Sequence, residues 1–527
     1  MKTKRMNGTP DVLTTGNETA VSRIVTAVFA FTVFCILVSV CFLSHVDYPV
    51  KSTWISNIIP IAVLTPILLS VAAFFPRPGK WYRTGIWKAA LVLLLFLIQI
   101  QAVYCYFFYT SWDVKRVIST SLRLAHGEGN KLSAYTYTYY SNYPNNLFLT
   151  SVFSGIIRVL NKVFPQTKGT EAEYVVLLAV QCFISQMAGV LTYCAAKRLF
   201  GKERYACISY CLFILLAGIS PWVSIPYSDS MGLAVPVAVL LLYLKPVNGK
   251  KVILKWFGIA ALSWLGYKLK PQLAVIFIAV VMIELFTIRH TLSEKKPEIM
   301  KAVCGIIAGI VCAVVIVAGC LHFFCNIQTE PEKRFGMAHF LMMGMNPGKG
   351  IWDSEDVAFS RSFDTARERD SANLQRAAER IGEMGPEGLA KQIIKKTLIN
   401  YNDGTFAWDD EGYFRVEIRE RPNDSFSSFV RDLYYADGKY HPLWKQVVHA
   451  VWVSVLFLSF FSVFSKKDKP RSVMMLTVIG LTVFLTVFEA RARYIYSNLP
   501  IFILLAVSGL QSITERVRGK VTGFSGT

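Results

Sequence analysis

The chain has 527 residues, of which 53% are hydrophobic and only 17% are charged, and its mean hydropathy is +0.41. This composition excludes an ordinary soluble protein, because apolar runs of about 17 to 25 residues, each long enough to cross a bilayer, recur along the chain. The formal net charge of +21 does not indicate nucleic-acid binding, because Lys and Arg cluster in short loops between the apolar runs.

About twelve apolar runs predict an all-α polytopic membrane protein, since lipid cannot satisfy a bare backbone. In chain order they are residues 22–43, 55–75, 88–110, 174–195, 204–222, 229–245, 252–268, 271–288, 302–324, 446–465, 472–488 and 495–512. Basic loops alternate with less basic ones along the chain. The basic loops and both termini are therefore expected in the cytoplasm, and loops 111–173 and 325–445 outside the cell.

One further apolar run, residues 147–163, would place every later loop on the wrong side if it crossed the membrane. We therefore expect an amphipathic or re-entrant helix at the outer interface. All eleven cysteines except Cys325 lie in or beside apolar runs, so structural disulfides are not expected. No spacing typical of metal ligands occurs, and no divalent metal or other cofactor is predicted.

Four regions follow from this pattern. Residues 1–87 hold two transmembrane helices, and residues 88–324 hold a catalytic transmembrane core with its outer loop. Residues 325–445 are polar and predict an extracellular α or α+β domain. Residues 446–527 hold three transmembrane helices and a cytoplasmic tail.

The 325–445 region has a helical pattern from about 365 to 398, which Pro386 is expected to interrupt. Its aromatic residues suffice for a small core or for a carbohydrate-stacking surface, and they include Trp352, Phe406, Trp408, Tyr413 and Phe414. Its acidic residues fit no EF-hand loop, so no metal is assigned to Asp353, Asp356, Asp403, Asp409 or Asp410.

Ionisable residues mark four outer ends of the apolar runs. They are Asp113 after the third run, Asp229 before the sixth, Lys268 and Lys270 between the seventh and eighth, and Arg491 and Arg493 between the last two. Such groups at membrane depth are costly and are candidates for function. The cations also lie on the side where positive charge is disfavoured.

Each position also has a purely structural interpretation. Asp113 and Asp229 can cap the helices that follow them, and Lys268 and Lys270 can reach lipid phosphates. Arg493 can pair with Glu489, four residues earlier on a helix. The aromatic stretch 135–143 can be an interface belt.

Together, carboxylates and cations on one membrane face suit transfer from a lipid-linked phosphate. Cationic side chains would neutralise a leaving phosphate, and an aspartate would take a proton from an acceptor hydroxyl.

Short motifs add a resemblance to this chemistry. They are Asp113, the stretch LRLAHGEG, Tyr143-Pro144-Asn145-Asn146-Leu147, Asp229 in YSDSMG, Leu269-Lys270-Pro271, and Arg493-Tyr494 with Pro500. In order and membrane side they resemble the GT-C integral-membrane glycosyltransferases related to protein O-mannosyltransferases and aminoarabinose transferases (glycosyltransferase family 39). The resemblance covers roughly residues 88–324 and 446–512. It departs from the family at Val114, where a Glu is common, at Tyr143-Pro144-Asn145, which replaces His-Pro-Pro, in two extra N-terminal helices, and at 325–445, which has no clear counterpart in the short members.

The resemblance implies a GT-C-like enzyme of a bacterial-type cell membrane with an extracellular active site. Its donor would be a polyprenyl-phosphate sugar, and its acceptor a cell-surface polymer, a lipid-linked glycan or a protein, with inversion at the sugar. Asp113 would be the base and Asp229 a helper. Lys270 and Arg493, with Lys268 and Arg491 as neighbours, would bind the donor phosphate, and Tyr140, Tyr143 and Asn145 would line the acceptor loop.

Two alternatives remain. A transporter or flippase of lipid-linked saccharides would favour charges at mid-membrane and broken helices, whereas these charges lie near helix ends. A non-catalytic scaffold presenting the 325–445 region would leave the outer acids and cations without a role.

Overall fold

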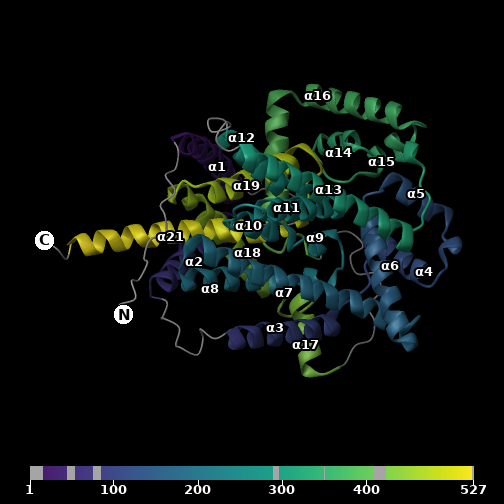
Figure 1. Ribbon diagram of the computed structural model, residues 1–527, viewed down its shortest axis with the longest axis horizontal. Helices are drawn as coiled ribbons and strands as arrows, with labels where there is room; N and C mark the ends of the chain where they lie inside the picture. Colours follow the sequence, from purple (N-terminus) through teal and green to yellow (C-terminus); the bar gives the residue numbers. More distant parts are fainter. Residues whose placement is uncertain are drawn as a thin grey trace.

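The protein, described here from a computed structural model, is a bundle of helices (Figure 1). The structure describes residues 16–43, 54–74, 85–288, 296–348, 350–408, 410 and 423–524. Every regular element within these residues is a helix, which confirms the all-α prediction. The apolar, β-branched and aromatic composition of the long helices suits burial in lipid, where all backbone groups must bond within the helix.

The helices fall into three consecutive groups along the chain. The first third contains α1 (Gly16–Phe42), α2 (Trp54–Phe74), α3 (Gly85–Tyr106), α4 (Trp112–Ala125), α5 (Ala134–Asn142), α6 (Asn146–Val163) and α7 (Ala172–Phe200). The middle contains α8 (Glu203–Phe213), α9 (Ser228–Met231), α10 (Val235–Tyr243), α11 (Lys251–Leu269), α12 (Val275–Ile288) and α13 (Lys296–Phe324). The last part contains α14 (Met337–Gly344), α15 (Ser354–Arg361), α16 (Ala366–Tyr401), α17 (Ser425–Tyr434), α18 (His441–Phe460), α19 (Lys469–Val487), α20 (Arg493–Tyr496) and α21 (Leu499–Phe524).

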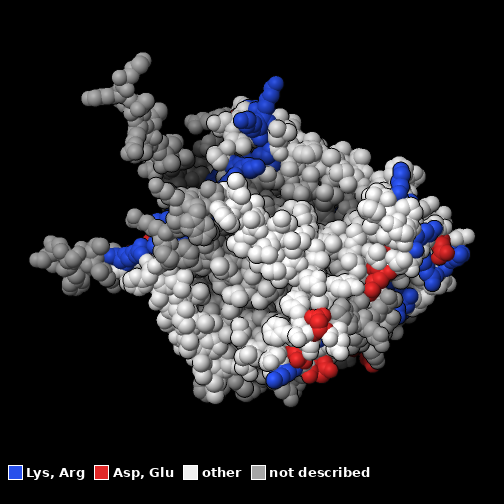
Figure 2. Space-filling model, turned by 90° about the horizontal axis from the view of Figure 1, so that it is seen from below, with Lys and Arg blue, Asp and Glu red and all other residues white. Residues whose placement is uncertain are grey.

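Nine helices in the described residues are long and apolar enough to cross a membrane, which makes the chain a multi-pass membrane protein. They are α1, α2, α3, α7, α11, α13, α18, α19 and α21. Figure 2 shows a face with broad areas that carry no charged side chain, while Lys, Arg, Asp and Glu gather toward its edges. A surface of this kind suits contact with lipid.

The other three predicted spans are shorter or broken. In place of 204–222, α8 passes into a π-helical turn at Ile214–Gly218. In place of 229–245 and 271–288, the structure has the short apolar helices Ser228–Tyr243 and Pro271–Thr287. Apolar composition does not show where a backbone leaves the helix, which is why the sequence count of about twelve exceeds nine. Two of these segments begin at turns that carry the candidate residues Asp229 and Lys270.

Two ends of the molecule differ in character. In Figure 1, α4, α5, α14 and α15 lie at the end opposite the C-terminal end of α21. Near the latter end, ion pairs join residues of helices that are distant in sequence, or of the chain next to them: Lys88–Glu203 at 2.8 Å, Lys202–Glu515 at 2.6 Å and Lys469–Glu284 at 3.0 Å. The basic loops expected in the cytoplasm around Lys88, Lys202 and Lys469 therefore meet at one end of the bundle.

The helix at 146–163, α6, packs against α4, α7 and α13. Phe148, Leu149, Phe153 and Ile157 are buried on its inner face, and Val159, Lys162 and Val163 are exposed. It is not among the nine helices long and apolar enough to cross a membrane in the described residues. Its position as an amphipathic or re-entrant helix at the outer interface stays a prediction.

The long helix α16 is bent in the middle. Its backbone leaves the helical conformation at Gly385, with φ 58° and ψ −175°, just before Pro386. This confirms the predicted interruption, since glycine tolerates positive φ and proline begins a new helical turn readily. The half after the bend packs against α1 and α19, and Tyr401 Oη lies 2.7 Å from Thr482 Oγ1.

The aromatic residues that follow α16 correct one expectation. Phe406 and Trp408 are fully buried, but they do not form the core of a separate outer domain. Trp408 stacks edge-on against Trp222 with ring centroids 5.5 Å apart, and Phe406 stacks against Trp452 at 5.2 Å. Because Trp222 and Trp452 belong to the helix bundle, this part of 325–445 is built into the bundle core. Tyr413 and Phe414 lie outside the described residues.

The membrane orientation is testable by cysteine labelling. On a background without the native cysteines, Ser362→Cys is expected to react with a membrane-impermeant maleimide in intact cells, because loop 325–445 is predicted outside. Arg516→Cys is expected to react only after the membrane is permeabilised. Both positions are exposed, so accessibility depends only on the side of the membrane. Labelling of residue 362 only after permeabilisation would contradict the predicted topology.

Candidate active site

A cavity of about 1920 Å³ opens where the turns that follow the long helices meet the segments α4–α6 and α14–α16. Its charged lining is dominated by cations. They are Lys115, Arg116, Lys268, Lys270, Arg334, Arg361, Arg491 and Arg493, against Asp113, Asp370 and Glu489. A recess with this balance attracts an anionic ligand. It also brings together residues that are almost 400 positions apart in the sequence.

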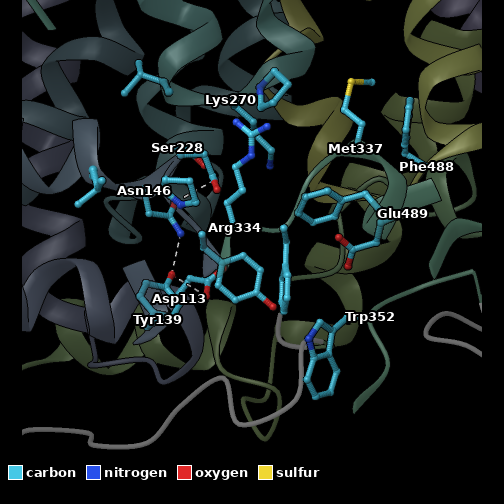
Figure 3. Close-up of a pocket in the computed structure, with 18 of the residues that line it drawn as sticks. Asp113, Tyr139, Asn146, Ser228, Lys270, Arg334, Met337, Trp352, Phe488 and Glu489 are labelled. Carbon is cyan, nitrogen blue, oxygen red and sulfur yellow. Dashed lines mark hydrogen bonds between the residues drawn. The ribbon is translucent and has the colours of Figure 1, made fainter. Parts of the chain in front are cut away.

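Asp113 lies on the wall of this cavity, in the first turn of α4. One interpretation of the sequence was that this side chain caps α4, but the N-cap residue is Ser111. Instead, Tyr139 Oη donates a hydrogen bond of 2.8 Å to Oδ1 (Figure 3), and Tyr227 Oη donates one of 3.1 Å to Oδ2. Each carboxylate oxygen offers about two lone-pair sites. One lone-pair site on each oxygen of Asp113 therefore remains for a ligand in the cavity.

The two phenols hold Asp113 without competing for its proton. Burial, and next the charge of Asp113, raise the pKa of Tyr139 and of Tyr227 well above the ordinary value. Both tyrosines therefore stay neutral donors over the physiological range. Asn146 Nδ2 donates to Tyr139 Oη at 2.6 Å and fixes the direction of that phenol (Figure 3). Within this network, the carboxylate is the group able to accept a proton.

A buried ion triad lies next to Asp113. Asp229, which is 2% exposed, pairs with Lys270 Nζ and lies 3.3 Å from Nη1 of Arg493. Asp229 lies in the first turn of α9, but its carboxylate serves the two cations rather than capping the helix. Two positive charges against one negative leave the triad with a net charge of about +1, and both cations line the cavity.

Aromatic rings orient the two cations. The Arg493 guanidinium stacks over Trp112, 4.4 Å from the ring centroid, and Lys270 Nζ lies 3.7 Å from the ring centroid of Tyr494. Trp112 adopts φ 36°, a left-handed conformation that is rare for a bulky residue. Strain of this kind concentrates at functional sites. It places the Trp112 ring beneath Arg493 while the next residue, Asp113, points into the cavity.

The segment before α20 carries a second ion pair. Arg491 Nε donates to Glu489 Oε1 at 3.1 Å, and Tyr494 Oη donates to Oε2 at 2.8 Å. Burial raises the pKa of Glu489, but Arg491, Tyr494 and Arg493 outweigh it and lower the pKa overall. Glu489 therefore stays ionised and offsets the charge of Arg491. Arg493, which one interpretation of the sequence paired with Glu489, reaches Asp229 as a member of the triad.

The other predicted site residues are placed unequally. Tyr143 and Asn145 line the cavity. Tyr140 is not among its lining residues: it is fully buried, and its hydroxyl lies 2.7 Å from Thr150 Oγ1. Lys268 lines the cavity but lies over the rings of Trp264 and Tyr267, at 5.5 and 5.7 Å. Lys268 is therefore placed by these two rings and, unlike Lys270, is not a member of the triad.

The most important residues that the sequence analysis missed are the partners of Asp113 and of the cations. Tyr139 and Asn146 lie inside or beside the aromatic stretch that was singled out, but alternation along a short helix does not show which phenol faces the carboxylate. Tyr227 and Tyr494 lie inside the quoted motifs YSDSMG and Arg493-Tyr494, but neither was assigned a role. A polar aromatic residue flanking a candidate ionisable residue was the available signal.

The acidic residues of 325–445 have structural roles. Asp353 caps α15 by accepting from the backbone N–H groups of residues 355 and 356, and Asp356 forms a 2.5 Å ion pair with Arg380. Asp403 accepts from the backbone N–H of Ala407 at 2.6 Å. Within the residues that the structure describes, no three His, Cys, Asp or Glu residues are grouped as metal ligands would be. Asp409 lies outside those residues.

The charge of Lys270 makes the site sensitive to pH. Burial lowers the pKa of Lys270 to about 8, although the charge of Asp229 opposes this shift. The cationic form therefore prevails below pH 8 and is lost as the pH rises through that value. We expect affinity for an anionic lipid phosphate to fall above pH 8. The Lys270→Arg variant should remove that dependence, since arginine keeps its charge. Titration of undecaprenyl-phosphate binding from pH 6.5 to 9.5 tests this, and identical profiles for both proteins would contradict it.

A buried lysine fixes the segment that carries the cations. Lys396, in the second half of α16, is fully buried. Its Nζ donates to three carbonyl oxygens, those of Gly344 at 3.0 Å, Thr486 at 2.6 Å and Phe488 at 2.5 Å. The last two carbonyls lie at the C-terminal end of α19, where a positive charge is favourable. Lys396 therefore connects α14 and α16 to the chain immediately before Glu489.

Removing this contact is expected to destabilise the protein and to weaken donor binding. Lys396→Met would leave the carbonyls of Thr486 and Phe488 without that donor, at about 1–3 kcal/mol for each unsatisfied group, whereas the carbonyl of Gly344 also accepts from Gln392 Nε2. Lys396→Arg keeps the charge and should recover part of the stability. Thermal unfolding and undecaprenyl-phosphate binding of both variants test the prediction. Unchanged melting of Lys396→Met would show that the carbonyls find other partners.

Comparison with known proteins places the chain in a family. No curated protein matches it. Among solved structures it is similar to ArnT from Cupriavidus metallidurans bound to undecaprenyl phosphate, with 13% identity over 83% of this chain and 79% of that one. The TM-score is 0.32, which is too low to transfer residue roles. The family described as conserved hypothetical integral membrane protein matches residues 13–513. Because this match covers nearly the whole sequence, the chain belongs to that family of integral membrane proteins.

Proposed function

We propose that the protein is a GT-C-type glycosyltransferase that moves a sugar from a polyprenyl-phosphate donor to a hydroxyl group of an extracellular acceptor. One observation supports this more than any other. A single cavity holds the carboxylate of Asp113, oriented by two neutral phenols, and the cations Lys270 and Arg493 on the same lining. A base and an anion site in one recess are what transfer from a lipid phosphate requires.

The reaction follows from these positions. The donor phosphate binds at Lys270 and Arg493, and its sugar extends toward Asp113. Asp113 takes the proton of the acceptor hydroxyl as the hydroxyl oxygen bonds to the anomeric carbon. The bond between that carbon and the phosphate oxygen breaks on the opposite face, so the sugar is inverted. The leaving polyprenyl phosphate carries the bonding electron pair, and the proton remains on Asp113 until it passes to water.

The cations contribute most when the bond breaks. The donor phosphodiester carries one negative charge, and the released phosphate monoester carries a second one as it forms. Fixed positive charges that meet developing negative charge lower the barrier without reorganisation. Asp229 holds Lys270 and Arg493 in place and offsets one of their charges. These side chains supply the neutralising charge in the proposed steps, and neither a metal nor an organic cofactor is invoked.

A reconstituted assay tests the proposal. The protein in lipid nanodiscs would receive undecaprenyl-phosphate sugars with a radiolabelled sugar, one sugar at a time, together with cell-envelope polymer. We expect transfer of label to the polymer and stoichiometric release of undecaprenyl phosphate, with no loss after chelation of divalent metals. If instead the labelled donor crosses the bilayer of proteoliposomes without cleavage, the protein is a transporter of lipid-linked saccharides and the proposal is wrong.

A further inference from the structure

The cavity contains more positive charge than the donor can use. The triad of Asp229, Lys270 and Arg493 has a net charge of about +1, and Arg491 is paired with Glu489. A polyprenyl-phosphate sugar is a phosphodiester with one negative charge. The single negative charge of the donor therefore balances the net charge of the triad. The other cations of the lining have no negative charge of the donor to bind.

Four of these other cations lie on the part of the lining formed by α4, α15 and the chain before α14. They are Lys115, Arg116, Arg334 and Arg361, against two carboxylates, those of Asp113 and Asp370. The acids nearest in sequence to Arg334 are engaged elsewhere: Glu330 pairs with Lys333 at 2.8 Å, and Glu332 accepts from the backbone N–H of Ala366 at 2.9 Å. A surplus of two positive charges thus faces the cavity here.

The cations are held in defined positions. The Arg116 guanidinium lies over the ring of Tyr135, 4.1 Å from its centroid. Arg361 Nη2 and Nε lie 3.2 and 3.1 Å from the amide oxygen of Asn142 once that amide is oriented to satisfy its neighbours. Planar guanidinium groups of this kind bind carboxylate and phosphate through two parallel hydrogen bonds.

An aromatic residue adjoins the cations. Trp352 lines the same cavity and is 48% exposed, so its ring is available to stack on a sugar. Tyr143 links this region to Asp113: its ring lies 5.4 Å from that of Tyr139, the hydrogen-bond partner of Asp113, and 5.2 Å from that of Phe335, the residue after Arg334. The cationic region is therefore continuous with the position at which an acceptor hydroxyl would meet Asp113.

We infer that this region, the anionic-glycan subsite formed by Lys115, Arg116, Arg334, Arg361 and Trp352, binds an acceptor that is a negatively charged glycan. The inference rests on the proposed function only in calling this glycan an acceptor. Binding of the glycan requires no sugar transfer. Arg334 and Arg361 hold the phosphate or carboxylate groups of the chain, Trp352 stacks on a sugar ring, and a hydroxyl of the glycan reaches Asp113.

Binding of defined oligomers tests the inference without any donor. The full-length protein in phosphatidylcholine nanodiscs would be titrated with a glycerol-phosphate oligomer, with oligogalacturonate and with neutral maltohexaose. We expect an anionic oligomer to bind, and to bind about tenfold more weakly to the Arg334→Gln/Arg361→Gln double variant or in high salt. The two anionic probes distinguish phosphate from carboxylate recognition, and maltohexaose should bind weakly to both proteins.

A matched control removes two charges from α16 outside the cavity lining. Arg376 and Lys391 are exposed and pair with Glu379 and Glu387, so the Arg376→Gln/Lys391→Gln variant should bind the anionic oligomers as well as the wild type. Equal weakening of both double variants would reduce the effect to overall charge and overturn the inference. Maltohexaose binding as tight as that of the anionic oligomers would also overturn it.

Binding of anionic lipid head groups, instead of a glycan, would give a different result. If neither anionic oligomer binds in phosphatidylcholine, and Arg334 and Arg361 instead enrich phosphatidylglycerol around the protein, the cations serve head groups and the inference is wrong. Its failure is separate from failure of the proposed function. A protein that binds the anionic oligomer but never cleaves a polyprenyl-phosphate sugar would retain the subsite and lose the enzymatic role.

Discussion

Asp113→Asn is expected to lower the rate of sugar transfer by about 10²–10⁴, the range typical for removal of a catalytic base. The amide has nearly the same shape as the carboxylate and can still accept hydrogen bonds from Tyr139 and Tyr227 through its oxygen. It cannot take a proton from the acceptor. Binding of undecaprenyl phosphate should be nearly unchanged, because the donor cations belong to other segments. The measurement is single-turnover transfer at saturating donor, together with donor affinity.

The control for this variant is Asp364→Asn, which makes the same chemical change at an exposed residue outside the cavity lining. It should retain wild-type turnover and wild-type melting temperature. The Tyr139→Phe variant is informative in a different way, since it removes one donor to Asp113 but leaves the carboxylate. It should lower the rate less than Asp113→Asn does. Wild-type turnover of Asp113→Asn with a normally folded protein would show that another group accepts the proton.

Arg493→Ala is expected to reduce kcat/KM for the donor by about 10²–10³, which is the usual loss on removing one preorganised donor to a developing negative charge. Arg493→Lys should also be impaired, because an ammonium group reproduces neither the planar fork of the guanidinium nor its stacking over Trp112. The loss should appear in donor binding as well as in turnover. Titration of undecaprenyl phosphate and steady-state kinetics with varied donor separate the two.

Stability needs to be separated from function in this experiment. Removing Arg493 leaves buried Asp229 with Lys270 as its remaining partner in the triad, and breaking a buried charge network costs about 3–5 kcal/mol. The Arg493→Ala/Asp229→Asn double variant removes one charge of each sign and should recover much of the stability without recovering donor binding. Lys268→Ala is the matched single-charge control, since Lys268 lies over Trp264 and Tyr267. An equal loss of donor binding in Lys268→Ala would argue against a specific phosphate site at Lys270 and Arg493.

The helical membrane architecture was predictable from sequence, because its cause is local. A run of apolar residues long enough to cross lipid must be helical, since no water is present to satisfy the backbone. The bend at Pro386 is similarly local, because the proline ring and the preceding glycine determine the backbone there. The π-helical turn at 214–218 was not predictable, since its composition is as apolar as that of the unbroken helices.

The candidate site likewise has residues that were predictable from sequence and residues that were not. Asp113, Lys270 and Arg493 were identified because ionisable side chains at the outer ends of apolar helices are costly and conspicuous in sequence. Their partners were decided only by the tertiary structure. Asp229 pairs with Lys270 and Arg493 across 41 and 264 positions, and the sequence carries no signal for which cation meets which carboxylate.

The region 325–445 shows the limit most clearly. Its polar composition indicated a loop outside the membrane, and the tertiary structure alone decided that Phe406 and Trp408 pack into the bundle core while Lys396 fixes the end of α19. Burial of an aromatic ring or of an ammonium group depends on what surrounds it in three dimensions. Composition determines which segments lie in lipid; complementary packing and charge pairing determine which of the remaining segments complete the cavity.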